Sequence, residues 1–449
     1  MLKRLTRVFS RKFVQDTITL QIGKGAVLVI SLAGSIAVPR LMQPEDYGVW
    51  QLTMTLFSLW QLLDLTGLVP GAHTRLPEAV GARDEDALLR FMAFYLRTAL
   101  IYSAASTLLL LGLHLLTPLA TSLYPDSDNA RAIVTMAVLL TLRRPLDMLF
   151  ALFVITFSSR RQMRYVATIQ SLNQLILTAA TVCAVIIYPL PIALVTAQLL
   201  YSLVTCTLVM AFYQRTRRSD ETVVFPAIVE IVRATTLPYP RNELGFGFSN
   251  ALDKNLSLLF TLLPVQITGR VAGEVAAGQL GLALSIVRQG NFFAASVLDN
   301  LRAVIPQAVG RGDYKRLWLN FRRVLGGLAG GAILFYGTLA LLAPFIPLLY
   351  GEKWVETVPL VQILVLFGLL VTLGGVFGPL YRVFNFMRGV LIYRGLTLAV
   401  GIPVGWWLIR QYGATGGAIM VVLLFALHVP LIVSLTMPEL RTRARAQQV

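Results

Sequence analysis

The sequence predicts an all-α polytopic membrane protein with about 12 transmembrane helices. Long apolar runs recur from one end of the 449-residue chain to the other, and 56% of the residues are hydrophobic. Only 14% are charged, whereas roughly a quarter of the residues in ordinary soluble domains carry charge. A helix needs about 20 predominantly apolar residues to cross the hydrocarbon core of a bilayer. The apolar runs reach that length repeatedly.

Charge clusters and Pro or Gly turns divide the apolar runs into candidate spans. The largest polar interruption leaves six spans on either side. It therefore predicts an N-terminal six-helix lobe (1–213), a cytoplasmic linker (214–244) and a C-terminal six-helix lobe (245–449). Because six is even, any internal symmetry would be a parallel repeat about an axis normal to the membrane. The candidate spans are 17–42, 47–70, 91–117, 130–157, 165–187, 191–213, 245–267, 276–308, 324–346, 357–381, 389–409 and 414–438.

A weak sequence similarity between the two halves agrees with this division. GARDEDALL (81–89) follows the second span, and GRGDYKRLW (310–318) follows the eighth. The number of residues that separates Gly48 from Gly278 is almost the same as the number that separates these two segments. The similarity is weak alone, but it repeats the division obtained from hydropathy.

Basic residues set the predicted orientation. Most Lys and Arg fall in the N-terminal segment, the linker, the C-terminal tail and the connections on the same side as these. Because cytoplasmic segments are enriched in Lys and Arg, we expect both termini in the cytoplasm. Topology and anionic inner-leaflet lipid then explain the net charge of +17 without any nucleic-acid partner. The first apolar run has the length of a full span and no small-residue cleavage site follows it, so we expect no cleavable signal.

Enzyme, metal and redox chemistry find little support in the sequence. Cys183 and Cys206 lie inside apolar runs, and the three histidines match no metal-ligand spacing. The predicted extracytoplasmic loops are too short to fold as catalytic domains, and the sequence carries no Walker-type nucleotide loop. We therefore expect no enzymatic activity, no cofactor and no metal.

Four segments at predicted helix boundaries carry a family resemblance. They are RLMQPEDYGVWQL (40–52), GRGDYKRL (310–317), LLYGEKWVETVPLVQIL (348–364) and RQYGATGGAIMVVLL (410–424). In this order they resemble the landmarks of the polysaccharide-transporter (Wzx-like) flippases, which belong to the multidrug/oligosaccharidyl-lipid/polysaccharide exporter (MOP) superfamily. The resemblance implies two six-helix lobes around a central cavity and an alternating-access mechanism.

The resemblance also implies a substrate and a location. It implies outward translocation of undecaprenyl-diphosphate-linked oligosaccharides across the bacterial inner membrane for lipopolysaccharide O-antigen, capsule or exopolysaccharide synthesis. The implied partners are the lipid-linked oligosaccharide, membrane lipid, and a polysaccharide polymerase or chain-length regulator. The sugar composition, the coupling ion and the oligomeric state stay open.

Cations inside the spans are the candidate diphosphate ligands. We single out Lys24, Arg143, Arg144 and Arg288, because charge at membrane depth is costly and a guanidinium fork grips phosphate oxygens at two points. Unpaired cations in the first, fourth and eighth spans predict a cavity of positive potential. Local ion pairs are the alternative, since Asp147 lies four residues from Arg143 and three from Arg144. It can neutralise only one of the two.

Two further features concern mechanism. Asp147 and Asp253 are buried carboxylates in a bundle poor in acids, so they are candidates for binding the coupling ion, although each has a cationic neighbour. In LLTLRRPLDM (139–148), Pro145 predicts an interruption of the fourth span near mid-membrane. Such a break requires protein or water to satisfy the freed backbone groups.

Three other functions remain alternatives. A multidrug extruder would need an acid-rich cavity for cationic drugs. A lipid II flippase is implied by the same superfamily, but such flippases typically carry two more spans. A membrane-embedded polysaccharide polymerase or ligase would need a large extracytoplasmic loop, which the sequence lacks.

Overall fold

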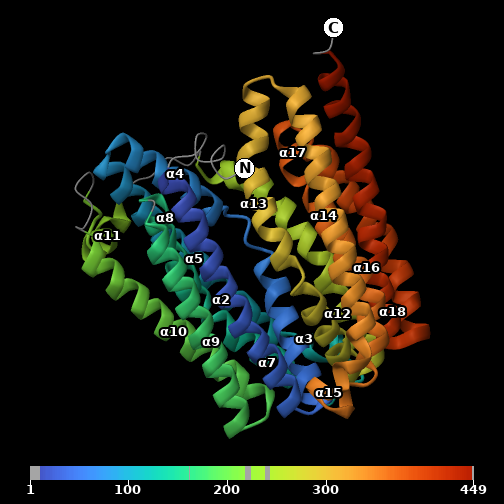
Figure 1. Ribbon diagram of the computed structural model, residues 1–449. Coiled ribbons are helices and arrows are strands. Elements are labelled where there is room, and N and C mark those ends of the chain that lie inside the picture. Colours follow the sequence, from blue (N-terminus) through green and yellow to red (C-terminus); the bar gives the residue numbers. More distant parts are fainter. Residues whose placement is uncertain (1–10, 161, 218–223, 238–242, 447–449) are drawn as a thin grey trace. The chain divides into compact units, whose positions relative to one another are not determined.

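The computed structural model describes residues 11–160, 162–217, 224–237 and 243–446, and their regular secondary structure is entirely helical (Figure 1). Seven of the described helices are long and apolar enough to cross a membrane. The prediction of an all-α polytopic membrane protein is therefore confirmed. The longer helices are α2 (Arg11–Leu41), α3 (Pro44–Gln61), α4 (Leu68–Ala82), α5 (Glu85–Leu116), α7 (Ala130–Thr141), α8 (Arg144–Ser159), α9 (Met163–Ile187), α10 (Pro191–Thr216), α12 (Glu243–Arg288), α13 (Asn291–Gly310), α14 (Tyr314–Leu342), α16 (Thr357–Gly375) and α18 (Met387–Ala446).

Short helical segments connect these helices. They are α6 (Leu119–Leu123), α11 (Ile228–Arg233), α15 (Ile346–Tyr350), α17 (Gly378–Val383) and the 3-10 turns Ala234–Thr236, Ala343–Phe345 and Glu352–Trp354. The chain divides into two compact units. Unit 1 comprises Met1–Leu41, Trp60–Ser122 and Arg131–Ala251, and unit 2 comprises Met42–Leu59, Leu123–Ala130 and Leu252–Val449.

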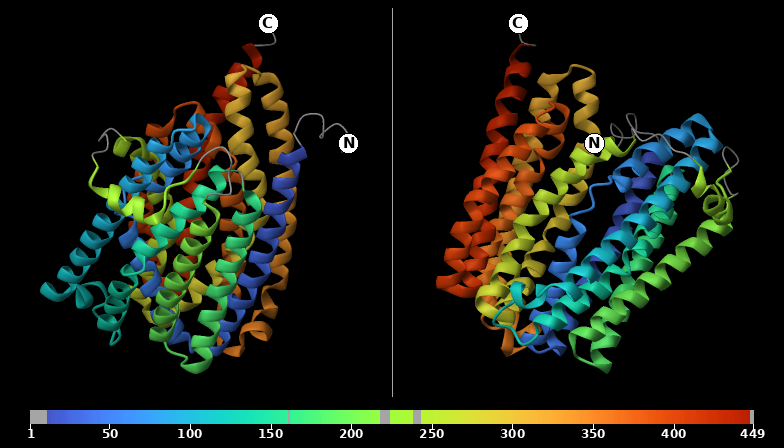
Figure 2. Two further views of the ribbon diagram at one scale, coloured as in Figure 1. Left: turned by 90° about the vertical axis from the view of Figure 1, so that its left-hand side faces the viewer. Right: turned by 180° about the vertical axis from the view of Figure 1, so that it is seen from behind.

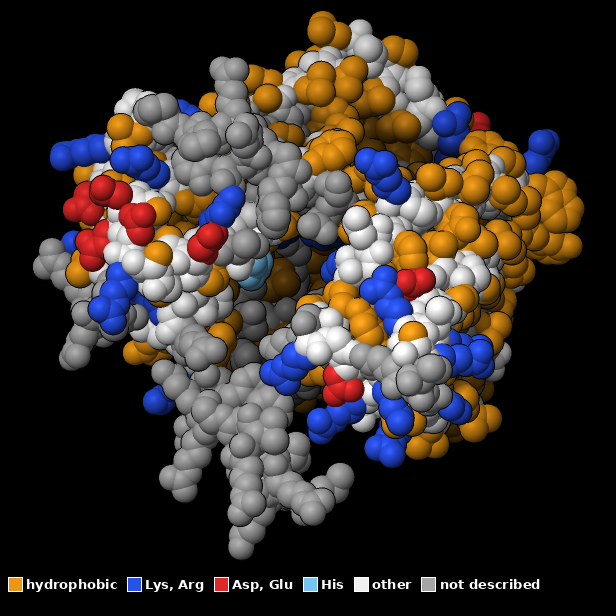
Figure 3. All heavy atoms as spheres, turned by 90° about the horizontal axis from the view of Figure 1, so that it is seen from above, with side chains coloured by type: hydrophobic (Ala, Val, Ile, Leu, Met, Phe, Trp, Pro, Cys, Tyr) orange, Lys and Arg blue, Asp and Glu red, His pale blue; other side chains and the backbone are white. Residues whose placement is uncertain are grey.

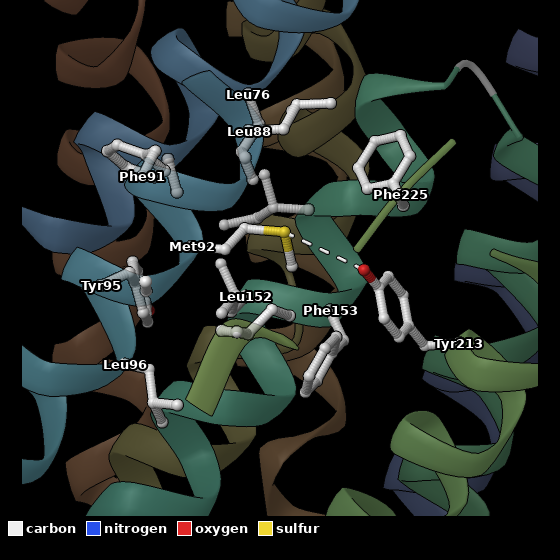
Figure 4. Packing of buried hydrophobic residues seen from close by; sticks show 14 of the residues in the cluster. Leu76, Leu88, Phe91, Met92, Tyr95, Leu96, Leu152, Phe153, Tyr213 and Phe225 are labelled. Carbon is white, nitrogen blue, oxygen red and sulfur yellow. Dashed lines mark hydrogen bonds between the residues drawn. The ribbon is translucent and has the colours of Figure 1, made fainter. Parts of the chain in front are cut away.

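Unit 1 is a bundle in which α9 packs against α2 and α10, while α8 packs against α4, α5 and α10 (Figure 2). Its apolar core joins α5, α8 and α10 through Met92, Leu152, Phe153 and Tyr213 (Figure 4). The Tyr213 hydroxyl, which is buried in this core, donates a hydrogen bond of 2.8 Å to the carbonyl of Pro226. The bond attaches the segment before α11 to the bundle.

Unit 2 packs α14 against α16 and α18, and α16 against α18 (Figure 2). Two of its helices are each divided by one glycine with non-helical backbone. Gly273 in α12 has φ 87°, and Gly413 in α18 has φ 55°. Side chains with a Cβ rarely adopt positive φ, so glycine suits both breaks. Gly273 lies between the predicted spans 245–267 and 276–308. Gly413 lies between the predicted spans 389–409 and 414–438.

The second predicted span needs correction. Its helix, α3, ends at Gln61 instead of continuing to residue 70. The Asp64 carboxylate accepts hydrogen bonds from the backbone nitrogen and the hydroxyl of Thr66, at 3.1 and 2.6 Å, and Gly67 follows with φ 63°. Such local side-chain bonds offer the backbone an alternative to the helix. The apolar pattern hid this turn because Leu62, Leu63 and Leu65 surround it.

Helices α3 and α12 approach closely inside unit 2. A Cβ added at Gly48 would lie 1.9 Å from the carbonyl oxygen of Glu274, and one added at Gly278 would lie 2.8 Å from that of Pro44. The two glycines that echo each other in the sequence therefore lie at one helix crossing. Only glycine fits this approach.

Basic side chains mark one end of unit 2. The turn from α13 to α14 and the end of α18 carry the exposed residues Arg311, Lys315, Arg316, Arg441 and Arg445. Seen from above, Lys and Arg side chains are more widespread on the molecule than Asp and Glu side chains (Figure 3). This end is the one that the sequence assigns to the cytoplasm, and the orientation itself stays a prediction.

Candidate functional site

The turn between α7 and α8 positions two adjacent arginines inside unit 1. The backbone nitrogen of Leu142 donates to the carbonyl of Leu139 at 3.1 Å, and that of Arg143 donates to Leu140 at 3.2 Å, which closes a tight turn. Pro145 lies in the first turn of α8, where its missing N–H costs least. The predicted interruption of the fourth span at Pro145 is therefore confirmed.

Arg143 is held by α8 and α10. Its Nε donates to Asp147 Oδ2 at 2.8 Å, and its Nη1 donates to the side-chain oxygen of Gln198. Asp147 also accepts from the Ser202 hydroxyl at 2.9 Å, and the guanidinium carbon lies 5.9 Å from the centre of the Tyr201 ring. The predicted pairing of one arginine with Asp147 is confirmed, and it is Arg143 that Asp147 holds.

Arg144 pairs with a carboxylate that is distant in sequence. Its Nη2 donates to Asp64, and its guanidinium carbon lies 5.8 Å from the centre of the Tyr102 ring. The Arg144 and Asp64 side chains are 16% and 14% exposed, so the pair is largely shielded from the surroundings. The Arg144 Nε is buried and has no hydrogen-bond partner among the described residues.

These pairs correct the expected charge of the fourth span. One unpaired cation was expected there, whereas Arg143 pairs with Asp147 and Arg144 pairs with Asp64, so each arginine has a carboxylate partner. The reason is the early end of α3, which places Asp64 in a turn within unit 1. An anion can bind Arg144 at this site by replacing Asp64, or by using a donor that Asp64 does not occupy, such as the buried Nε.

Of the two other candidate cations, the structure describes only the side chain of Arg288. Lys24 belongs to α2, but its side chain lies outside the described residues. Arg288 is the last residue of α12 in unit 2; it is exposed and makes no ion pair with the part of the chain that the structure describes. Unit 1 thus brings together Arg143, Arg144 and Asp147.

Asp253 belongs to a second buried cluster, in unit 2. Its carboxylate forms an ion pair of 2.6 Å with Arg394 and accepts a hydrogen bond of 2.9 Å from the Tyr381 hydroxyl. The Arg394 Nε donates in turn to His428 Nε2 at 3.2 Å. Lys254, the adjacent cation that was the alternative partner of Asp253, is exposed and makes no ion pair with it among the described residues. Arg394, in the span 389–409, pairs with Asp253 instead, and Arg382 adds a longer ion pair of 3.4 Å.

Arg394 was not among the site residues predicted from the sequence. The signal was present, because an arginine within an apolar span is costly wherever it occurs. No group of three or more His, Cys, Asp or Glu able to hold a metal occurs among the described residues.

Comparisons with known proteins agree with this architecture. No protein-family model matches the chain. Among solved structures, an inward-facing multidrug resistance MATE family transporter of the MOP superfamily superposes with a TM-score of 0.73 at 16% identity, covering 95% of this chain and 99% of that one. The chain has the MOP transporter fold.

A second structure of this fold differs in its pocket. It is a MOP superfamily transporter from Pyrococcus furiosus, for which reversed polarity of the binding pocket suggests a different function. It superposes with a TM-score of 0.68 at 16% identity and 96% coverage of both chains. The MOP fold therefore does not fix the substrate, and the substrate must be argued from the site.

One relative is similar to this chain in sequence. The lipopolysaccharide biosynthesis protein WzxC of Escherichia coli (strain K12) is 26% identical over 187 residues. The match spans 37% of the length of each protein. The resemblance to Wzx-like members of the MOP superfamily, first seen in four short segments, is thereby confirmed.

Proposed function

We propose that this multi-pass membrane protein is a flippase that moves undecaprenyl-diphosphate-linked oligosaccharide from the cytoplasmic to the outer leaflet by alternating access. The observation that carries the proposal is Arg144, a permanent cation at the break between α7 and α8, inside the predicted fourth span. Similarity to WzxC supports a role in cell-surface polysaccharide synthesis. The proposal includes the bacterial inner membrane, cytoplasmic termini and lobes at 1–213 and 245–449.

The chemistry of a diphosphate fits the arginine pair. A diphosphate cannot cross hydrocarbon unescorted, and a planar guanidinium can bind two of its oxygens at once. In our proposal the diphosphate displaces Asp64 from Arg144, while Asp147 and Gln198 keep Arg143 in position. Lys24 and Arg288 supply further positive charge along the path. A potential that is negative inside favours outward movement of negative charge by about 2.3 kcal/mol per charge per 100 mV.

A multidrug extruder is the second candidate, and one observation favours it. The carboxylate of Asp147 is 32% exposed, and a cationic drug could compete with Arg143 for it. The two candidates then differ in which member of the cluster meets the substrate. An arginine contacts an anionic lipid, whereas an aspartate contacts a cationic drug.

The test compares arginine variants in reconstituted vesicles. We expect Arg144→Gln to reduce flipping of a fluorescent polyprenyl-diphosphate oligosaccharide about tenfold or more, because a charge-assisted bidentate contact is lost. Arg144→Lys should recover part of the activity, since a point charge lacks the fork. Arg131→Gln, an exposed arginine at the start of α7, is the matched control and should flip normally.

Two outcomes would overturn the proposal. Full flipping by Arg144→Gln at equal protein content would show that the arginine is structural. Efflux of cationic dyes that is lost in Asp147→Asn but kept in Arg144→Gln would establish the extruder instead.

A further inference from the structure

A groove of about 580 Å³ lies in unit 2 between the first turns of α14 and the last turns of α18. Trp318 and Arg322 line it from α14, and Arg441 and Arg445 line it from α18. Each pair is spaced by four residues, so its members share one helix face. Two helix faces therefore direct three arginines and one tryptophan into the same groove.

Within the part of the chain that the structure describes, no carboxylate pairs with the arginines of this groove. The guanidinium carbons of Arg441 and Arg322 lie 5.3 and 5.7 Å from the centre of the Trp318 ring. Neither they nor Arg445 form an ion pair within the described part of the chain. The nearby Glu439 is committed to Arg443 at 2.6 Å. Three like charges facing one groove favour an anion there.

The other half of the groove is apolar. Leu325 and Ala329 continue the face of α14, and Met437 lies opposite them on α18. Gly326 leaves space, because a Cβ added there would meet no atom within 4 Å. The candidate membrane span Tyr314–Tyr350 includes all of α14, and Leu325 and Gly326 lie in the first half of that helix. The groove thus runs from a cationic end toward the hydrocarbon.

We propose that the groove binds one anionic phospholipid. The phosphate would lie among the three arginines, and an acyl chain would lie along Gly326 toward the membrane. Trp318 suits the boundary, since tryptophan is enriched where hydrocarbon meets water. A free phosphate would leave the apolar half unfilled. In the predicted topology this lipid belongs to the inner leaflet, and its binding is independent of the transported substrate.

The experiment measures thermal unfolding of the purified full chain in a neutral detergent. Titration with phosphatidylglycerol should raise the unfolding midpoint, and phosphatidylcholine should not. The variant Arg322→Gln/Arg441→Gln/Arg445→Gln should need about tenfold or more phosphatidylglycerol for half the effect. The matched control, Arg311→Gln/Arg316→Gln/Arg323→Gln, removes three exposed arginines from the same end of unit 2 and should respond as the unmodified protein does.

A second variant separates shape from charge. Gly326→Leu fills the apolar half without changing any charge, so it should also weaken the response to phosphatidylglycerol. An unchanged response in both groove variants would overturn the proposal. An equal response to inorganic phosphate would overturn it too, because the groove would then bind a free anion. If the triple variant does not fold, Gly326→Leu and Arg441→Gln decide the question by the same titration.

Discussion

Arg394 and Asp253 form a buried ion pair in unit 2, with 2.6 Å between the Arg394 Nη1 and the Asp253 Oδ1. The side chains are 7% and 2% exposed, and 141 residues separate them in the sequence. The same Nη1 also donates to the Asp253 backbone carbonyl. The pair therefore joins α18 to α12, and neither charge has ready access to water.

Removing either partner should destabilise the protein strongly. Asp253→Asn leaves the Arg394 charge buried and uncompensated, which costs about 3–5 kcal/mol. Arg394→Gln should cost less, because Arg382 still lies 3.4 Å from Asp253 Oδ2. The double variant should lose less than the sum of the two, because contacting residues are coupled. Thermal unfolding in detergent measures this, and Lys254→Gln, an exposed neighbour, is the control. Strict additivity of the two losses would contradict the coupling.

The helices followed from the sequence because their causes are local. A span is set by the length of an apolar run, so hydropathy located the spans. The breaks at Gly273, Gly413 and Pro145 were also predictable, since glycine and proline act on the backbone where they stand. The end of α3 at Gln61 was missed, because one aspartate turn interrupts a leucine-rich run without a composition change.

The partners of the buried charges did not follow from the sequence. Pairing within one helix face was predictable, and Asp147 does hold Arg143. Arg144 instead pairs with Asp64, and Arg394 pairs with Asp253. Periodicity within one helix carries no information on which helices become neighbours. Tertiary packing determines which helices become neighbours. It places Asp64 beside Arg144, so Arg144 is paired although the sequence predicted an unpaired cation.

Arg160 holds the start of the linker against unit 1. Its Nη1 donates to the carbonyl of Thr216 at 3.0 Å, and its guanidinium carbon lies 3.8 Å from the centre of the Phe225 ring. Arg160→Lys keeps the charge but loses the planar group that stacks on the ring. We expect faster cleavage of the linker by proteinase K, whereas Arg164→Lys, at an exposed position, should be cleaved at the unmodified rate. Equal cleavage of both variants would show that the stacking does not retain the linker.

The crossing of α3 and α12 should tolerate no side chain. Gly48→Ala would place a Cβ 1.9 Å from the Glu274 carbonyl oxygen, so the helices must separate at a cost of about 1–3 kcal/mol. Gly337→Ala in α14 meets no atom within 4 Å and should stabilise by up to about 1 kcal/mol through helix propensity. Thermal unfolding should therefore move in opposite directions in the two variants. A Gly48→Ala protein as stable as the unmodified one would rule out the close crossing.

Substitutions of Asp64 and Arg144 should change the affinity for diphosphate in opposite directions. If the substrate displaces Asp64, then Asp64→Asn removes a competitor and keeps an oxygen that can accept from Thr66. We expect it to tighten binding of undecaprenyl diphosphate about tenfold, which corresponds to about 1.4 kcal/mol. Arg144→Gln should weaken binding by at least as much.

The double variant and a control complete this test. Asp64→Asn/Arg144→Gln should bind as weakly as Arg144→Gln alone, because the competitor matters only while the cation is present. Asp86→Asn, an exposed carboxylate in the first turn of α5, should bind as the unmodified protein does. Calorimetric titration of the purified protein gives each affinity. If Asp64→Asn weakens binding as much as Arg144→Gln does, the pair acts as one structural unit. The diphosphate must then bind elsewhere, with Arg288 in unit 2 as the next cation to test.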